Sequence, residues 1–249
     1  YILGRDFSGI VSAVGDAVDD LKVGDSVFAV CDAGLEGAYA EKIAIKAAIV
    51  AKKPDAIAHA DAAALALAGL TALISIEDTL HLASGETILI QGGAGGVASI
   101  AIELAKHFGA HVITTASAAN HDYVRSLGAD EVINYATRDF TDIGQICDVA
   151  YDTVGGDVGT RSIDVLKPGG RIASIAAGPA GVETTRADVT SLRPNVARDR
   201  PHLERLVDLF EAGAIHAPEL THYPLSEAVA AHVISEGRHL RGKLVFDVR

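Results

Sequence analysis

Apolar and polar positions follow two different rhythms along the chain. Between residues 87 and 192, short apolar runs alternate with stretches of helical periodicity, whereas residues 7–50 carry only short apolar or alternating runs separated by turn sequences. Strands that alternate with helices predict a parallel sheet. The chain closes on a helix and a last strand, which we expect to pair with the β-rich start. The pattern therefore predicts an α/β unit inserted into a β-rich part.

The pattern also gives approximate bounds. Expected strands cover 7–14, 26–30, 37–45, 87–91, 111–115, 131–133, 147–152, 171–176, 189–192 and 242–248. Expected helices cover 61–68 with Asp61 as N-cap, 71–81, the stretch that ends at Gly109, 121–127, 158–165, 203–212 and 227–235, and residues 167–170 form a turn. We expect a doubly wound parallel sheet of the Rossmann type over 65–213, between β-rich segments 1–64 and 214–249.

The stretch 87–117 is the most informative, because it combines a strand, a glycine turn, a helix and a second strand. Residues Gly93–Ala98 fit the pattern G-x-G-x-x-A. In such a turn the first glycine allows a tight bend, the second lets a pyrophosphate approach the backbone, and the last small residue lets helix and strand pack closely. Free N–H groups at the helix start attract phosphates. With this flanking structure, dinucleotide binding is favoured over a merely structural turn.

The end of the second strand bears on the choice of cofactor. NAD-binding folds place an acidic residue there to accept from the ribose 2′-hydroxyl. Here the sequence is TTASAAN, without a carboxylate, which permits NADP(H). Ser117 and Asn120 are able to donate to a 2′-phosphate, and His121 is the only nearby candidate cation. An alternative of equal weight is that Asn120 simply caps the helix that follows.

Composition limits the partners. The net charge of −12 and the absence of a basic block argue against nucleic acid and anionic membranes as partners. The apolar run 60–76 is interrupted by polar residues and is interpreted as a buried helix, not a membrane span. Cys31 and Cys147 are far apart, without a CxxC pair, which excludes a four-cysteine zinc site and indicates a reducing, cytoplasmic compartment.

Taken together, these segments resemble the medium-chain dehydrogenase/reductase superfamily, and within it the zinc-independent quinone oxidoreductase (zeta-crystallin-like) branch. The matching segments are 3–9, 23–27, 69–72, 91–98, 127–130, 133–135, 152–156, 168–171 and 242–245. The resemblance implies a Rossmann domain inserted into a GroES-like substrate domain. Since family chains are longer at the N-terminus, it also implies that this substrate domain is incomplete and the chain N-terminally truncated.

The resemblance implies roles for individual residues around NADP(H). Gly93 forms the turn, and Ala94, Gly95, Gly96 and Val97 hold the pyrophosphate; Ser117, Asn120 and Tyr135 surround the adenosine ribose and its 2′-phosphate; Thr71, Thr153, Val154, Gly155, Ala176 and Ala177 lie near the nicotinamide and its ribose; Lys243 completes the cofactor-binding set. The family often has lysine at position 120 and glycine at position 98, so this chain departs from it at both.

Residues 5 and 6 bear on whether the protein binds a metal. Zinc-dependent relatives carry His-Glu where this chain has Arg5-Asp6, and an arginine that stays protonated is no zinc ligand. We therefore expect no metal. Without a zinc ion to polarise an alcohol, reduction of an activated acceptor, a quinone or an α,β-unsaturated carbonyl, fits better.

No general acid stands out. Tyr39 is a weak candidate that is more simply explained by packing, and Arg5 and Asp6 either orient substrate or pair with each other.

Three functions remain open at this stage. The first is an NADPH-dependent quinone or enone reductase, which the resemblance suggests is a homodimer joined through an edge of the sheet. The second is a nucleotide-binding sensor or structural protein without turnover. The third is an enoyl-thioester reductase module of a larger chain.

Overall fold

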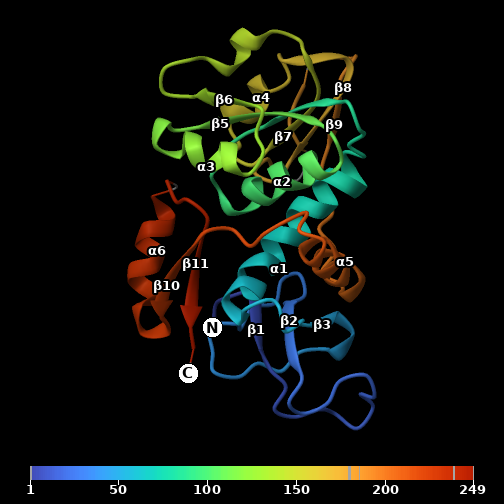
Figure 1. The fold of residues 1–249 in the computed structure, drawn as a ribbon, viewed down its shortest axis with the longest axis vertical. Helices are drawn as coiled ribbons and strands as arrows, with labels where there is room; N and C mark the ends of the chain where they lie inside the picture. The colour runs from blue at the N-terminus through green and yellow to red at the C-terminus, as the bar shows by residue number, and fades with distance from the viewer. Residues whose placement is uncertain (1, 179–180, 185, 238, 249) are drawn as a thin grey trace. The chain divides into compact units, whose positions relative to one another are not determined.

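The computed structural model describes residues 2–178, 181–184, 186–237 and 239–248. The chain forms two compact units, one of Tyr1–Leu70 with Ala197–Arg249 and the other of Thr71–Val196 (Figure 1). The sequence pattern had suggested junctions at 64/65 and 213/214. Helix α5 (Arg200–Glu211) is thus grouped with the β-rich segments.

The unit Thr71–Val196 contains one parallel sheet, as predicted. Its strands are β4 (Thr87–Ile90), β5 (His111–Ala116), β6 (Glu131–Asn134), β7 (Cys147–Asp152), β8 (Leu166–Ser174) and β9 (Thr190–Leu192). They lie in the order β6-β5-β4-β7-β8-β9, and every neighbouring pair is parallel. The chain order reverses between β4 and β7, and the crevice at the carboxyl ends of two such strands is where doubly wound sheets bind ligands.

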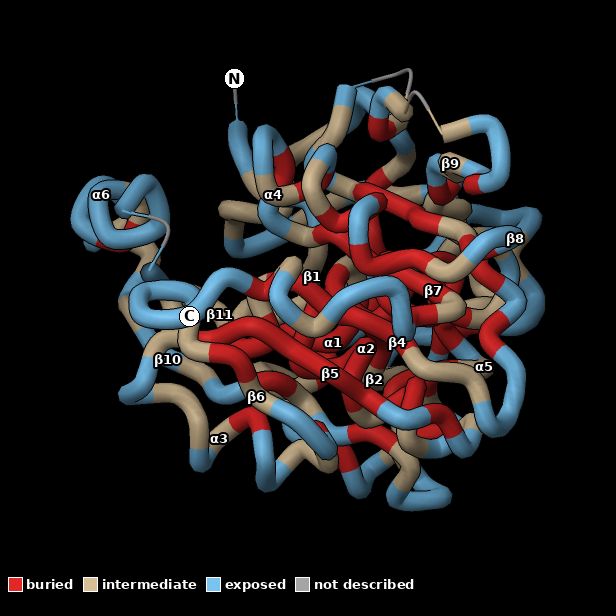
Figure 2. The backbone as a smooth tube through the Cα atoms, turned by 90° about the horizontal axis from the view of Figure 1, so that it is seen from above, coloured by how far each residue is buried: buried red, intermediate tan, exposed pale blue. Residues whose placement is uncertain are grey.

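Apolar side chains on both faces of this sheet account for its burial. Strands β4, β5 and β7 are buried along almost their whole length, as the red segments of Figure 2 show. The helices that flank them are α2 (Gly96–His107), α3 (His121–Ser126) and α4 (Asp157–Arg161), with single 3-10 turns at Ala118–Asn120 and Phe140–Ile143. Helix α2 packs on β4 and β5, and α3 on β6. The glycine turn is thereby placed at the carboxyl end of β4.

The two helices expected over 61–68 and 71–81 are one. Helix α1 (His59–Leu73) continues directly into the π-helical turn Ile74–Thr79, and Asp61 lies in its first turn and is not its N-cap. Gly69 lies inside this helix, where Leu206 Cδ1 packs 2.8 Å from the position that a Cβ would take, so the close approach requires a residue without a side chain. Within the described residues, the stretch His59–Thr79 is long and apolar enough to cross a membrane, but 72% of its most apolar window is buried inside the protein, as in a core helix.

Two further expectations fail in the α/β unit. The turn expected at 167–170 lies inside β8, where Gly169 takes a positive φ of 81° and the pairing with β7 shifts register between Cys147 and Val149. Helix α4 has only five residues, where eight were expected. The first error arises because a glycine bend was taken to end a strand that tolerates it. The second arises because the N–H groups of Ile163 and Asp164 donate three residues back, to Thr160 and Arg161, in turns that do not continue the α-helix.

The other unit carries two small sheets. Strands β1 (Asp6–Ile10), β2 (Ser26–Val30) and β3 (Val50–Lys52) pair antiparallel, and β10 (Leu220–Pro224) pairs parallel with β11 (Lys243–Asp247). Helices α5 (Arg200–Glu211) and α6 (Ala228–Glu236) and 3-10 turns at Ala47–Ile49 and Leu225–Glu227 complete it. Helix α6 is exposed over most of its length and appears pale blue in Figure 2.

Two strand predictions for this unit are wrong. Residues 37–45 form no strand, because the backbone N–H groups of Gly37, Ala38 and Tyr39 donate to the carbonyls of Leu3 and Gly4 without a continuing ladder. The last strand, β11, pairs with β10 and not with the start of the chain. Strand β10 was missed because its sequence LTHYP contains a proline and lacks apolar alternation.

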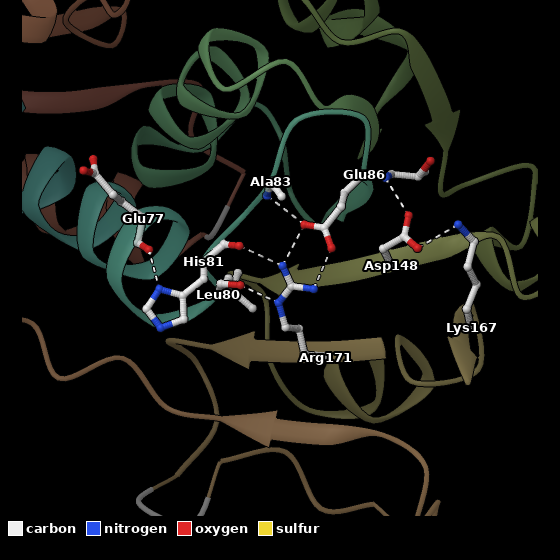
Figure 3. A network of polar contacts seen from close by, with 9 residues as sticks. Glu77, Leu80, His81, Ala83, Glu86, Asp148, Lys167 and Arg171 are labelled. Atoms are coloured by element: carbon white, nitrogen blue, oxygen red, sulfur yellow. Dashed lines mark hydrogen bonds and ion pairs between the residues drawn. The ribbon is translucent and has the colours of Figure 1, made fainter. Parts of the chain in front are cut away.

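At the amino ends of the sheet strands, a charged cluster joins three chain segments (Figure 3). The Arg171 guanidinium donates to both carboxylate oxygens of Glu86, at 2.8 and 2.7 Å, and also to the carbonyls of Leu80 and His81. Both charged side chains are 22% exposed. The Arg171 guanidinium holds the pKa of Glu86 below its ordinary value. This pair ties the segment after the π-helical turn to strand β8.

We expect the Glu86–Arg171 pair to make stability depend on pH. A carboxylate whose pKa is lowered on folding stabilises the protein above its unfolded pKa, and that contribution is lost as the pH falls through the folded value. Glu86→Gln should therefore cost about 1–2 kcal/mol at pH 7 and progressively less below about pH 4. Urea unfolding of the wild type and the variant at pH 7 and below about pH 4 measures this cost, with Glu211→Gln at an exposed position as control. A cost that does not shrink in acid would contradict the assignment.

Candidate functional site

The turn between β4 and α2 is shaped by glycines with steric reasons to be there. Gly92 has a φ of 73°, and a Cβ on it would lie 2.9 Å from Val154 Cγ2. A Cβ on Gly93 would overlap Thr114 Oγ1 of the neighbouring strand. Gly92 and Gly93 donate from their N–H groups to the Thr115 hydroxyl at 3.0 Å and the Thr115 carbonyl at 2.9 Å. The turn is therefore packed tightly against β5.

Helix α2 starts without a side-chain cap. Its N-cap residue is Gly95, and no side chain among the described residues accepts from the first N–H groups of the helix. The first N–H groups of an α-helix have no partner inside the helix, and together with the helix dipole they bind phosphate. A Cβ on Gly95 would have only the Gly92 carbonyl oxygen nearby, at 3.4 Å. The turn thus fits a pyrophosphate.

A buried polar network lies beneath the turn, and these contacts were not predicted from the sequence. The Gln91 side chain, which is 1% exposed, accepts from the Thr115 hydroxyl at 2.7 Å and donates to the Ser162 hydroxyl at 3.0 Å. The Gln91 carbonyl accepts from the Thr153 hydroxyl at 2.8 Å. The available signal was a glutamine directly after an apolar strand. This network fixes the turn to both neighbouring strands.

The residues predicted for the 2′-phosphate follow β5 and β6. Asn120 donates from its side-chain amide to the Ser117 hydroxyl at 3.2 Å, and it occupies the N-cap position of helix α3 without a side-chain hydrogen bond to the helix. Asn120 thus stands at the helix start, as the cap alternative expects, but its amide pairs with Ser117, and the two side chains form a polar pair at the carboxyl end of β5. Tyr135 follows β6 and is 54% exposed. His121 begins α3, and within the described part of the chain its buried Nε2 atom has no hydrogen-bond partner.

The residues predicted for the nicotinamide end lie on two loops and one helix. Loops 153–155 and 176–177 follow β7 and β8 and contact each other, since a Cβ on Gly155 would lie 2.9 Å from Ala176 Cβ. Thr71 lies near the end of α1, and its carbonyl accepts from the buried Ser75 hydroxyl at 2.6 Å. Ser75 is also a polar neighbour of the fully buried Tyr151 phenol. Burial raises the pKa of this phenol.

Comparison with known proteins identifies the family. Residues 127–246 match the family model described as zinc-binding dehydrogenase, and residues 1–55 match the alcohol dehydrogenase GroES-like domain. The Escherichia coli quinone oxidoreductase complexed with NADPH superposes with a TM-score of 0.87 at 32% identity, over 98% of this chain and 82% of that one. The chain belongs to the medium-chain dehydrogenase/reductase superfamily. Within the superfamily it falls in the zinc-independent quinone oxidoreductase branch.

Two curated plant proteins are also similar. A 2-methylene-furan-3-one reductase from Solanum lycopersicum is 39% identical over 211 residues, which is 81% of this chain and 53% of that protein. The chloroplastic NADPH-dependent alkenal/one oxidoreductase of Arabidopsis thaliana is 36% identical over 257 residues, which is 97% of this chain and 62% of that protein. This member of the superfamily therefore spans between half and two thirds of the length of these two relatives.

The weak catalytic candidates of this superfamily member all lie in its β-rich unit. Arg5 and Asp6 do not pair with each other: Arg5 donates to Glu36 at 3.2 Å, and Asp6 accepts from Lys243 at 2.8 Å. This ion pair gives Lys243 a partner, and its place at the cofactor stays a prediction.

Tyr39 packs edge-on against the Phe246 ring at 4.6 Å, and its hydroxyl lies 3.3 Å from His232 Nε2. Burial raises the pKa of Tyr39. These contacts support packing as its role, as the sequence analysis favoured.

Within the described ranges, no three His, Cys, Asp or Glu side chains come together as a metal site. Cys31 and Cys147 are free thiols and both are buried. Burial raises the pKa of Cys147 to about 12, so this thiol stays protonated and unreactive at neutral pH.

Proposed function

We propose that this protein is an NADPH-dependent oxidoreductase that transfers hydride to a quinone or an α,β-unsaturated carbonyl without zinc. The observation that carries the proposal is the glycine turn at the uncapped start of α2, together with the residues after β5. There a serine–asparagine pair, Ser117 and Asn120, stands where NAD-binding folds place a carboxylate. A carboxylate at that point would repel a 2′-phosphate. NADPH-linked relatives in the same superfamily support the same cofactor.

Different residues of the α/β unit contact different parts of the cofactor. The dinucleotide supplies the hydride when bound, and the chain supplies position. The N–H groups of residues 94–97 bind the pyrophosphate, and the hydroxyl of Ser117 and the amide of Asn120 bind the 2′-phosphate. Thr71 and the loops 153–155 and 176–177 contact the nicotinamide half. The buried Gln91 network keeps the turn fixed while the cofactor enters and leaves.

The acceptor follows from the residues that stand at the zinc-ligand positions of other relatives. By its resemblance to the zinc-dependent relatives, the chain has Arg5 where they carry a histidine ligand, and an arginine stays protonated. An acceptor that carries its own activation suits such a site, because a quinone or enone delocalises the charge that hydride addition leaves on it. The substrate is therefore a conjugated carbonyl, and alcohol oxidation is disfavoured.

Steady-state oxidation of NADPH, followed at its reduced-nicotinamide absorbance, tests this function. We expect turnover with a small quinone or an enone, at a rate that prior dialysis against a zinc chelator changes by less than about twofold. Binding of NADPH without turnover of any acceptor would favour the sensor or structural role. Turnover of an enoyl thioester but not of quinones would favour a reductase module. Loss of rate on dialysis would overturn the metal-free mechanism.

We also propose that two copies associate through an edge of the parallel sheet, in a reducing, cytoplasmic compartment. Strands β6 and β9 are the two edges, and each leaves one side of its backbone unpaired within the sheet. Sedimentation velocity at micromolar concentration is expected to show a dimer, and a monomer at all concentrations would refute this association.

A further inference from the structure

One buried carboxylate lies between the two loops predicted to contact the nicotinamide. Asp152, the last residue of β7, is fully buried. One of its oxygens accepts from the N–H groups of Val154 and Gly155, both at 2.9 Å. These contacts fold the loop after β7 back over the end of its own strand. Asp152 lies in one of the segments that resemble the family, 152–156, and no role was predicted for it from the sequence.

The second oxygen of Asp152 reaches the neighbouring strand. It accepts from the hydroxyl of Ser174, the last residue of β8, at 2.7 Å, and Ser174 is 1% exposed. The Ser174 oxygen in turn accepts from the N–H groups of Ala176 and Ala177, at 3.2 and 2.9 Å. Gly159 leaves room for this arrangement, since a Cβ there would lie 2.5 Å from Asp152. Four loop N–H groups thus depend on two adjacent side chains.

We propose that Asp152 and Ser174 are positioning residues that fix the nicotinamide half of the bound cofactor and leave its adenosine half unaffected. They orient the loops 153–155 and 176–177 together, because the hydrogen-bonded pair Asp152–Ser174 accepts from backbone N–H groups of both loops. The adenosine half has separate supports: the Ser117–Asn120 pair follows β5, and the turn is fixed by Gln91 and Thr115. The inference rests on the proposed cofactor site.

The two halves are separable by ligand. Adenosine 2′,5′-bisphosphate carries the adenosine, the 2′-phosphate and one phosphate of the pyrophosphate, but no nicotinamide. Ser174→Ala removes the acceptor of two loop N–H groups and the donor to Asp152, and an unsatisfied polar group weakens the geometry it supported. We expect the Kd of NADPH to rise about tenfold and that of adenosine 2′,5′-bisphosphate to change by less than about twofold.

Asp152→Asn provides a second variant of nearly the same shape. Its amide oxygen still accepts from Val154 and Gly155, but its NH₂ group faces a Ser174 oxygen that already accepts two hydrogen bonds. The same selective loss of NADPH affinity is expected, together with a lower kcat at saturating NADPH because the ring is misplaced. Ser191→Ala is the matched control: it removes a hydroxyl that accepts from the Val182 N–H at 3.2 Å, on strand β9.

Equal weakening of both ligands in the Ser174 and Asp152 variants would show a general structural role and overturn the inference. Unchanged NADPH affinity in both folded variants would overturn it too. Failure of the wild-type protein to bind NADPH would instead refute the proposed cofactor site. Thermal unfolding of each variant, measured in parallel, shows that the proteins compared are folded.

Discussion

Alanine at position 95 is expected to weaken NADPH binding by more than about tenfold while changing the free energy of unfolding by less than about 1 kcal/mol. Gly95 has a φ of −75°, which any residue adopts, and the nearest atom to a Cβ built there is the Gly92 carbonyl oxygen at 3.4 Å. The protein itself therefore tolerates the methyl group. A pyrophosphate that must approach this backbone does not.

Gly93→Ala is the contrasting variant. Its Cβ would overlap Thr114 Oγ1 and lie 3.1 Å from Ile102 Cδ1, inside the packed interface of turn, strand and helix. Overpacking of this kind costs about 1–3 kcal/mol of stability. Urea unfolding and fluorescence titration with NADPH separate the two effects. The assignment of the turn fails if Gly95→Ala binds NADPH as tightly as the wild type.

A carboxylate at position 117 is expected to reverse the cofactor preference. Ser117 lies directly after β5, where its hydroxyl accepts from Asn120. In the Ser117→Asp variant, the new charge would face the 2′-phosphate at short range, and like charges brought together at a partly buried site cost several kcal/mol. We expect the affinity for NADPH to fall about 100-fold, while NADH, whose ribose hydroxyl donates to a carboxylate, binds as well or better.

Ser126→Asp is the control for this change, because it adds the same charge to the exposed side of α3 in the same unit. Titration of both variants with NADPH and NADH is the measurement. An equal loss of NADPH affinity in both would indicate a long-range effect of net charge. An unchanged ratio of the two affinities in Ser117→Asp would place the 2′-phosphate elsewhere.

Local sequence was sufficient where one segment carries the whole signal. The strands β4 and β5 and the end of helix α2 between them were predicted within a residue or two, because apolar strands, positional glycines and the Gly109 helix end all agree. The parallel sheet followed from the alternation of such segments. The candidate cofactor residues lie at strand ends and turns for the same reason.

Contacts between distant segments were not predictable in this way. Gln91 bonds to the side chains of Thr115 and Ser162, and Asp152 bonds to that of Ser174. Each pair is separated by 22 or more residues in sequence, and no local pattern links the partners. The pairing of β11 depended on β10, whose sequence is not strand-like. The glycine inside α1 is explained by Leu206, a residue distant in sequence that packs against Gly69. In each case tertiary packing overrides the local preference.

Comparative titration of the wild-type protein with NADPH and NADH tests the central claim most directly. The glycine turn and the Ser117–Asn120 pair predict saturable binding of both, with NADPH bound at least about tenfold more tightly, because only NADPH offers a phosphate to that pair. Tighter binding of NADH, or binding of neither, would contradict the account.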